Sequence, residues 1–354
     1  MGSKSKQGGS IKSALGLIGL CLSLAACQRS ALPQDVAYLD QLPGPSQFIA
    51  EYTGRQMNVV DVPDGHKYKW DLPTSAIEGP GAWVHQDRVT WAPGIRSFAF
   101  ATARSATLIS ATGLATQLNL QMPGKLQPLA GMETYSISPD GQLLAYYLLT
   151  RDADEPQWDG LGHLYQDLMI QEAHGSAPRS ILKGTRPSSI TWSPDSDRIA
   201  LGTGQGKLLV LDLSGKVLQS IPVRSGNKDP AGNPFDAIAD VRWQPSGESI
   251  ALIDNSELYI VHADGSNLHK VLLTPLPNSV AAFTWSPDGK HFAFRSVTSR
   301  SCHFALRTDS FRQCTIETAL FVSDADGKNM KKVPGSDIGD DQTLGNTLFW
   351  LMRE

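Results

Sequence analysis

The sequence lacks the short signatures that identify many hydrolases and nucleotide-binding enzymes. It contains no G-x-S-x-G nucleophile elbow, no H-E-x-x-H zinc motif and no G-x-x-x-x-G-K-[ST] phosphate loop. These absences argue against an α/β-hydrolase, a zinc protease of that type and a P-loop enzyme. The sequence therefore names no catalytic residue, no cofactor and no metal site.

A strong charge of either sign is also missing. The 354 residues carry a formal net charge of −4, and 19% of them are charged. A nucleic-acid-binding protein usually shows a basic patch, so no nucleic-acid partner is expected. With 41% hydrophobic residues, the chain has an ordinary globular composition and is long enough to form a full core.

The apolar segment at the N-terminus is short for a membrane span. Three lysines precede an apolar run over residues 14–26, which is the pattern of a secretory signal peptide. The run ends in the sequence Leu-Ala-Ala followed by Cys27, which resembles a bacterial lipobox. That resemblance implies a signal peptide over residues 1–26 and a lipid on Cys27. The alternative is a plain secretory signal with an incidental cysteine.

Cysteine is scarce, with four residues in the chain. Cys21 lies in the leader, and Cys27 would carry lipid. Cys302 and Cys314 remain, and an even pair in an exported protein predicts a disulfide. Two free thiols or half of a metal site are the alternatives. Zinc would need more ligands, and only His303 is close in sequence.

The sequence does contain an internal repeat. Phe283–Phe294 reads FTWSPDGKHFAF, which is two apolar runs joined by a Ser-Pro-Asp-Gly turn, and this pattern predicts a β-hairpin. Related hairpins recur with anchors at intervals of 42 to 55 residues, a period typical of propeller blades. The anchor positions are Trp91, Ile137, Trp192, Trp243 and Trp285. We expect these tryptophans to pack between blades.

A second β-rich element follows each hairpin and ends in a polar glycine turn, so one repeat makes a four-stranded blade. The elements are Leu208–Gly215, Leu258–Gly265 and Leu320–Gly327. With the W-S-P-D-G of Trp285–Gly289 and the D-A-D-G of Asp324–Gly327, the pattern resembles the TolB-type, WD40-like propeller repeat. The resemblance covers residues 46–354 and implies an all-β propeller.

The number of blades follows from the two ends of the repeat region. Strands are expected at Gln47–Tyr52, Met57–Val62 and Lys67–Leu72, but the innermost strand of their blade is missing there. Thr347–Leu351 would supply it and close the ring without an open edge. The prediction is a six-bladed propeller over residues 46–354, preceded by a flexible tether over residues 27–45. The five complete blades are expected at about 83–120, 130–183, 188–223, 238–273 and 280–333.

Four long inserts are expected on one face of this propeller, at residues 150–163, 224–237, 298–316 and 334–346. Loops of this length in a compact domain are often functional, although neutral surface growth is the alternative. Tryptophan and arginine often dominate binding energy at protein interfaces. The candidate partner-binding residues in the inserts are Arg151, Asp154, Trp158, Lys228, Phe235, Arg307 and Arg312.

The resemblance implies that the channel and the loop-bearing face receive peptide segments or partner domains. We therefore expect a non-enzymatic, lipid-anchored scaffold that binds an envelope protein or peptide. Gln28 after the lipobox favours the outer membrane, facing the periplasm. The main alternative is a propeller-fold enzyme, such as a polysaccharide lyase or glycan-acting hydrolase, with His85, His163 and His303 clustered at the channel mouth. A purely structural envelope lipoprotein is a third reading, and the sequence sets no oligomeric state.

Overall fold

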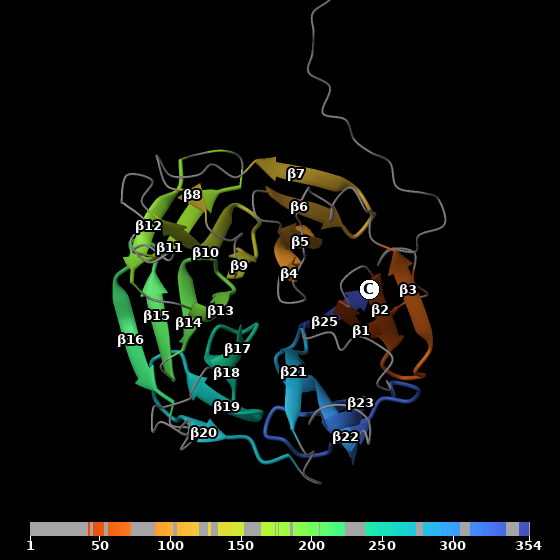
Figure 1. Ribbon diagram of the computed structural model, residues 1–354. Helices are drawn as coiled ribbons and strands as arrows, with labels where there is room; N and C mark the ends of the chain where they lie inside the picture. The colour runs from red at the N-terminus through yellow and green to blue at the C-terminus, as the bar shows by residue number, and fades with distance from the viewer. Residues whose placement is uncertain are drawn as a thin grey trace, which may run out of the picture.

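The computed structural model shows six β-sheets arranged as blades around a central channel (Figure 1). Each blade has its first strand nearest the channel. The structure describes residues 42, 45–52, 56–71, 89–101, 105–119, 127–128, 134–151, 164–173, 175, 177–184, 187–204, 206–223, 238–273, 279–304, 312–337 and 347–353. No helix within these ranges is long and apolar enough to cross a membrane.

Five blades are formed by consecutive strands, as the repeat predicts. Blade 1 contains β4 (Val89–Ala92), β5 (Ser97–Ala101), β6 (Ser105–Ser110) and β7 (Ala115–Asn119), with the short helix η2 (Pro93–Ile95) after β4. Blade 2 contains β9 (Thr134–Ile137), β10 (Leu143–Arg151), β11 (Leu164–Glu172) and β12 (Arg179–Lys183). Blade 3 contains β13 (Pro187–Trp192), β14 (Arg198–Thr203), β15 (Lys207–Asp212) and β16 (Val217–Pro222). Blade 4 contains β17 (Ile238–Trp243), β18 (Ser249–Asp254), β19 (Glu257–His262) and β20 (His269–Lys270). Blade 5 contains β21 (Val280–Trp285), β22 (His291–Phe304), β23 (Arg312–Asp324) and β24 (Lys331–Lys332).

The sixth blade joins the two ends of the repeat region, which confirms the predicted closure. Its strands are β25 (Thr347–Arg353), β1 (Ser46–Tyr52), β2 (Gln56–Asp61) and β3 (Lys67–Asp71), in that order from the channel. β25 pairs with β1 along its whole length, from Ser46 opposite Arg353 to Tyr52 opposite Thr347. We call this sheet the closing blade.

The turns between the first and second strands of blades 2, 3 and 5 share one hydrogen-bond pattern. In blade 5, the Ser286 hydroxyl donates to Asp288 and accepts the backbone N–H of His291 at 2.9 Å. Ser138 makes the same pair of contacts in blade 2, and Ser193 makes them in blade 3. A serine and an aspartate two residues later therefore fix these three turns locally, which is why the sequence motif is a reliable sign of the hairpin.

Glycines at the turns between the third and fourth strands let neighbouring blades meet. Gly215 has φ +90°, and a Cβ there would lie 1.9 Å from the carbonyl oxygen of Ile181 in blade 2. Gly65 in the closing blade has φ +71°, and a Cβ there would lie 2.2 Å from the carbonyl oxygen of Pro334, after blade 5. A side chain at either position would force the blades apart, so glycine is required by position as well as by backbone angle.

Anchor tryptophans pack between blades, as expected: Trp243 packs with residues of blade 3, and Trp285 packs with residues of blade 4. Two of the anchors also donate hydrogen bonds to the preceding blade. The indole N–H of Trp192 donates to the Ser136 carbonyl oxygen of blade 2 at 2.9 Å, and that of Trp285 donates to the Arg242 carbonyl oxygen of blade 4 at 3.2 Å. Trp350 in the closing blade is 6% exposed. Its indole nitrogen has no hydrogen-bond partner among the described residues.

A buried ion pair crosses the interface between blade 5 and the closing blade. The Arg295 guanidinium donates from Nε and Nη2 to the two carboxylate oxygens of Glu51, both at 2.6 Å, and from Nη1 to the hydroxyl of Thr318 at 3.1 Å. The two charged side chains are 1% and 2% exposed. Residues 244 positions apart in sequence are thus joined by a bidentate contact.

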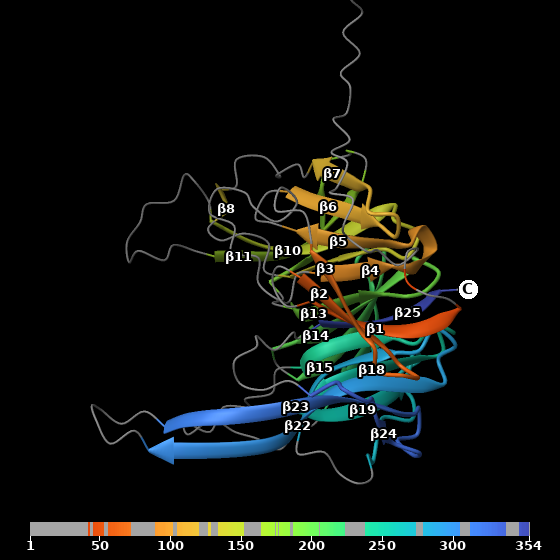
Figure 2. The ribbon, with the colours of Figure 1, turned by 90° about the vertical axis from the view of Figure 1, so that its right-hand side faces the viewer.

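Two features differ from the expected blades. Residues 298–316 were expected to be a loop, but β22 continues to Phe304 and β23 begins at Arg312, so most of the insert is a long antiparallel hairpin. It projects from one side of the ring in the edge-on view (Figure 2). A short strand that the sequence did not indicate, β8 (Gln127–Pro128), pairs with the end of β10.

Candidate functional site: the central channel

The channel is lined by the first strand of every blade and encloses a cavity of about 410 Å³. Most of its polar groups are hydroxyls, from Thr90, Ser136, Ser188, Ser189, Thr191 and Thr347. Trp91 and Trp192 contribute aromatic surface. Among the described residues in its wall, only Asp240 and Arg242 are charged.

Asp240 and Arg242 come from one strand, β17, and are two residues apart. Side chains two apart on a strand share a face, so both project towards the channel. The Nε of Arg242 donates to an Asp240 carboxylate oxygen at 3.1 Å, and the side chains are 19% and 23% exposed for Asp240 and Arg242 respectively. The wall thus holds one partly buried ion pair.

Blade 3 supports this pair through serine hydroxyls. The Ser189 hydroxyl accepts the backbone N–H of Val241 at 3.1 Å and donates to Asp240 at 3.4 Å. The Ser188 hydroxyl donates to the carbonyl oxygen of Ile238. Strand β17 is therefore held in place on the side facing blade 3.

Burial raises the pKa of the Asp240 carboxyl, and the neighbouring Arg242 guanidinium opposes that rise. The Nη groups of Arg242 have no hydrogen-bond partner among the described residues, and the guanidinium carbon lies 5.9 Å from the ring centre of Phe349. Arg242 is thus oriented by Asp240 and Phe349 while keeping donors for a ligand. Carboxylates and carbonyl oxygens are the groups that such donors recognise.

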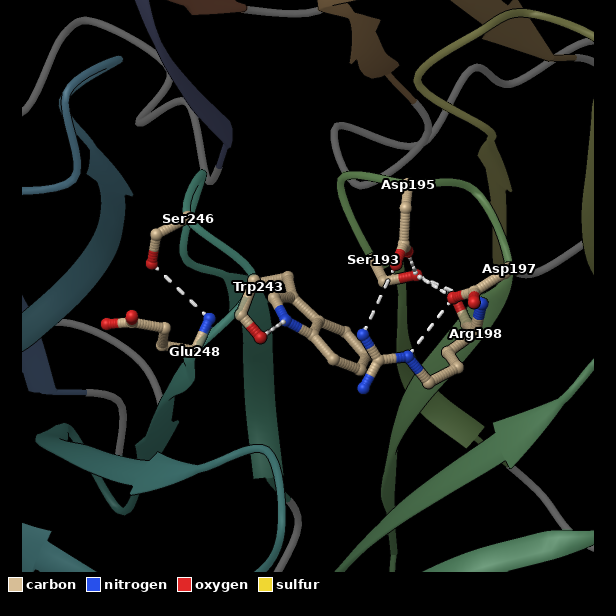
Figure 3. Close-up of polar contacts among 8 residues, drawn as sticks. Ser193, Asp195, Asp197, Arg198, Trp243, Ser246 and Glu248 are labelled. Carbon is tan, nitrogen blue, oxygen red and sulfur yellow. Dashed lines mark hydrogen bonds and ion pairs between the residues drawn. The ribbon is translucent and has the colours of Figure 1, made fainter.

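A second hollow, of about 580 Å³, lies between blades 3 and 4 beside the short turns. Arg198 forms part of its wall, with its guanidinium carbon 5.0 Å from the ring centre of Trp243 (Figure 3). Asp197 and Asp195 hold Arg198 at 3.1 and 3.4 Å. We call this hollow the blade 3–4 groove.

The predicted partner-binding residues lie at or beyond the limits of the described structure. Asp154, Trp158, Lys228, Phe235 and Arg307 lie outside the described residues, as does the predicted lipid site, Cys27. Arg151 is the last residue of β10, and Arg312 is the first residue of β23. The ends of β10, β11, β22 and β23 extend from the same side of the ring (Figure 2).

The structure describes both cysteines of the predicted disulfide but only one histidine of the predicted cluster. Cys302 and Cys314 are direct partners in the register of β22 and β23. His85 and His163 lie outside the described residues, and His303 lies in β22. The part of the chain that the structure describes contains no group of three or more metal-ligating side chains.

The channel pair was not identified from the sequence. Asp240 and Arg242 occur inside an anchor run that reads DVRW, next to Trp243. The sequence signal that could have identified these two residues is a pair of opposite charges two positions apart in the first strand of a blade. Only the ring arrangement shows that this strand face lines the channel.

Comparison with known proteins supports the fold. No family model matches the chain, and no curated protein matches it by sequence. A solved structure of a protein assigned as a TolB, from Agrobacterium tumefaciens, superposes with a TM-score of 0.51 at 16% identity, covering 88% of this chain and 99% of that one. A hydrazine synthase from Kuenenia stuttgartiensis gives a TM-score of 0.42 at 15% identity, covering 70% of this chain and 66% of that one. The ring of six four-stranded blades, closed by its C-terminal strand, therefore has the TolB-type β-propeller fold.

Proposed function

We propose that the protein is a non-enzymatic scaffold that binds an extended segment of a partner protein at the channel and its insert-bearing face. The observation that supports this most is the arrangement of Arg242 in the channel wall. Arg242 lines a cavity rich in hydroxyl groups, Asp240 holds its Nε, and its Nη groups have no hydrogen-bond partner among the described residues. Hydroxyl and guanidinium donors suit the carbonyl and carboxylate oxygens of a polypeptide.

The inserts would extend this site beyond the channel. Arg151 and Arg312 lie at strand ends on the side from which the long hairpins project. The other proposed contact residues belong to the segments that follow strands β10, β16 and β22. They are Asp154, Trp158, Lys228, Phe235 and Arg307. Tryptophan and arginine at such positions would supply most of the binding energy.

A disulfide between Cys302 and Cys314 would rigidify the largest insert. Residues directly opposite in an antiparallel ladder have Cα atoms about 4.5 or 5.5 Å apart, which suits a disulfide. Their pairing in register therefore supports the proposed bond. A rigid hairpin loses less conformational entropy when a partner binds.

We also place the protein in the bacterial envelope, anchored through lipid on Cys27 and facing the periplasm. The leader and its Leu-Ala-Ala-Cys boundary are the basis of this proposal. A scaffold held near a membrane by residues 27–45 would meet partners of the same compartment at a raised effective concentration.

The test compares the two faces of the ring. The partner would be isolated by crosslinking in the envelope and then titrated against purified variants. Trp158→Ala, Arg307→Ala and Arg242→Ala should each weaken capture about tenfold or more, with little change in melting temperature for the two insert variants. Asp326→Ala and Lys290→Ala, on the short-turn face, serve as matched controls. Equal loss from both faces, or loss only from the controls, would contradict the proposal.

A further inference from the structure

Strand β16 is an outer strand with an open edge. Among the described strands it pairs only with β15. Val217 is 43% exposed and Leu218 is 38% exposed. The six residues of β16 read VLQSIP and include no charge. Open edges of this kind present unpaired N–H and C=O groups, and proteins commonly guard them with charged side chains or by shortening the strand.

The other described outer strands are guarded by charge, by shortness or by polar exposed residues, whereas β16 has only a bulge at Leu218 and a proline, Pro222, at its end. β3 and β12 each carry two basic residues, while β20 and β24 are two residues long and contain lysine. β7 is uncharged, but its Leu118 is 3% exposed, and the exposed residues Thr116 and Gln117 are polar. Within the described chain, β16 alone combines six residues, no charge and two exposed large apolar side chains.

The edge of β16 is continuous with the blade 3–4 groove. Leu218 and Gln219 belong to both, because they line the groove from its blade 3 side. The groove also carries charges of both signs, with Arg198 on blade 3 and Glu248 and Asp264 on blade 4. In a two-fold interface each surface patch meets its own copy, so a patch with both signs of charge can complement itself.

We propose that this surface binds a second copy of the chain, with the two β16 strands antiparallel across a two-fold axis. Blade 3 of each copy would then contribute four strands to one continuous sheet. The absence of charge on β16 favours self-pairing, because like charges brought together across the axis would oppose it. The exposed Val217 and Leu218 would be covered by the partner copy, and the groove beside them would receive its charged side chains.

The first test is the oligomeric state of the protein without its leader, measured by sedimentation equilibrium. We expect a concentration-dependent dimer with a Kd on the order of 10 µM, as suits an interface of one strand and a groove. A protein that stays monomeric at about 100 µM would overturn the proposal. That holds even if β16 were then found to bind a segment of another protein.

A charge-exchange experiment tests the register. Ser220 is exposed and lies near the middle of β16, so its two copies would lie near the axis. Ser220→Lys and Ser220→Glu should each weaken self-association at least tenfold, and an equimolar mixture of the two should restore it. Thr116→Lys, on the outer strand β7, is the matched control and should remain dimeric. Dimers that persist in both Ser220 variants, a mixture that stays monomeric, or equal loss in the control would overturn the assignment.

Discussion

At the scale of single residues, the buried pair of Glu51 and Arg295 is the contact that most depends on a correct ring. Burying two charges costs several kcal/mol per ion, and that cost is offset only when the geometry is good and the remaining donors are satisfied. Here both carboxylate oxygens are engaged, and Nη1 donates to Thr318. The pair therefore specifies how blade 5 meets the closing blade.

Removing one partner of this pair should be costly. Arg295→Ala leaves the Glu51 charge buried without its guanidinium, so we expect the free energy of unfolding to fall by about 3–5 kcal/mol. Urea denaturation followed by tryptophan fluorescence measures the change. The double variant Glu51→Leu with Arg295→Met should recover much of the loss, because no charge is then buried. A single variant that unfolds like the wild type would show that the pair is not formed in solution.

The turn aspartates give a pH dependence at the same scale. Partial burial tends to raise the pKa of Asp195, but the hydrogen bond from Ser193, with contacts to Asp197 and Arg198, outweighs it and lowers the pKa to about 2 from 3.8. Because the folded pKa lies below the unfolded one, the stabilisation is present above about pH 4 and is lost as the pH falls towards 2. For so exposed a carboxylate it is below about 1 kcal/mol.

Asp195→Asn tests this dependence through melting temperature. The variant should melt below the wild type at pH 7, and the difference should shrink between about pH 4 and pH 2. Glu248→Gln, in the neighbouring blade, is a control whose carboxylate accepts no hydrogen bond among the described contacts. A difference for Asp195→Asn that stays constant down to pH 2 would contradict the assigned cause.

At the scale of elements, the sequence predicted what is encoded locally. The hairpins were predictable because Ser, Pro, Asp and Gly at fixed turn positions form the contacts that the structure shows at Ser138, Ser193 and Ser286. The extension of β22 and β23 was not, because residues 298–304 and 312–316 are largely polar at both alternating positions. A strand without an apolar face gives no two-residue periodicity to detect.

The channel residues show a similar limit. Asp240 and Arg242 are ordinary members of an anchor run in the sequence, and their role depends on which strand face points inward. Likewise, nothing local joins Glu51 to Arg295, since the contact requires the whole ring. Long-range pairs of this kind cannot be deduced from turn chemistry or periodicity in one sequence.

The closing strand gives the sharpest prediction for an element. Deleting residues 347–354 removes β25 and its seven paired positions with β1, and exposes apolar surface on both neighbouring blades. We expect insolubility or a large fall in melting temperature. The loss in free energy of unfolding should be well beyond the roughly 0.5 kcal/mol or less that a surface substitution costs. Soluble yield and differential scanning fluorimetry measure it. A truncated protein that melts like the full chain would show that β25 does not hold the ring together.

The proposed disulfide should affect only the hairpin formed by β22 and β23. Mass spectrometry of the non-reduced protein should show one peptide pair joined through Cys302 and Cys314. Because the cysteines lie far out on β22 and β23, Cys302→Ser with Cys314→Ser should leave the melting temperature of the ring nearly unchanged while increasing amide exchange in residues 298–316. Free thiols in the protein isolated from an oxidising compartment would refute the pairing.

At the scale of the whole molecule, the proposed lipid anchor on Cys27 would set where the propeller works. Cys27→Ser should abolish labelling by palmitate and leave the protein either soluble in the periplasm or held by its uncleaved leader. The physical reason is that a diacylated cysteine keeps a protein at the membrane surface, whereas a serine offers no thiol to modify. Ser30→Ala, three residues on, is the matched control and should retain the label. An unlabelled wild-type protein would remove Cys27 as a lipid site.

Closure by the last strand also sets the order in which the molecule can be completed. A chain made from its N-terminus presents β1, β2 and β3 long before β25 exists, and these three strands cannot form a finished blade by themselves. The contacts that complete it join residues separated by about the length of the domain, a topology that slows folding. The closing blade therefore stays incomplete until the final residues emerge, which would keep the ring open during the proposed export.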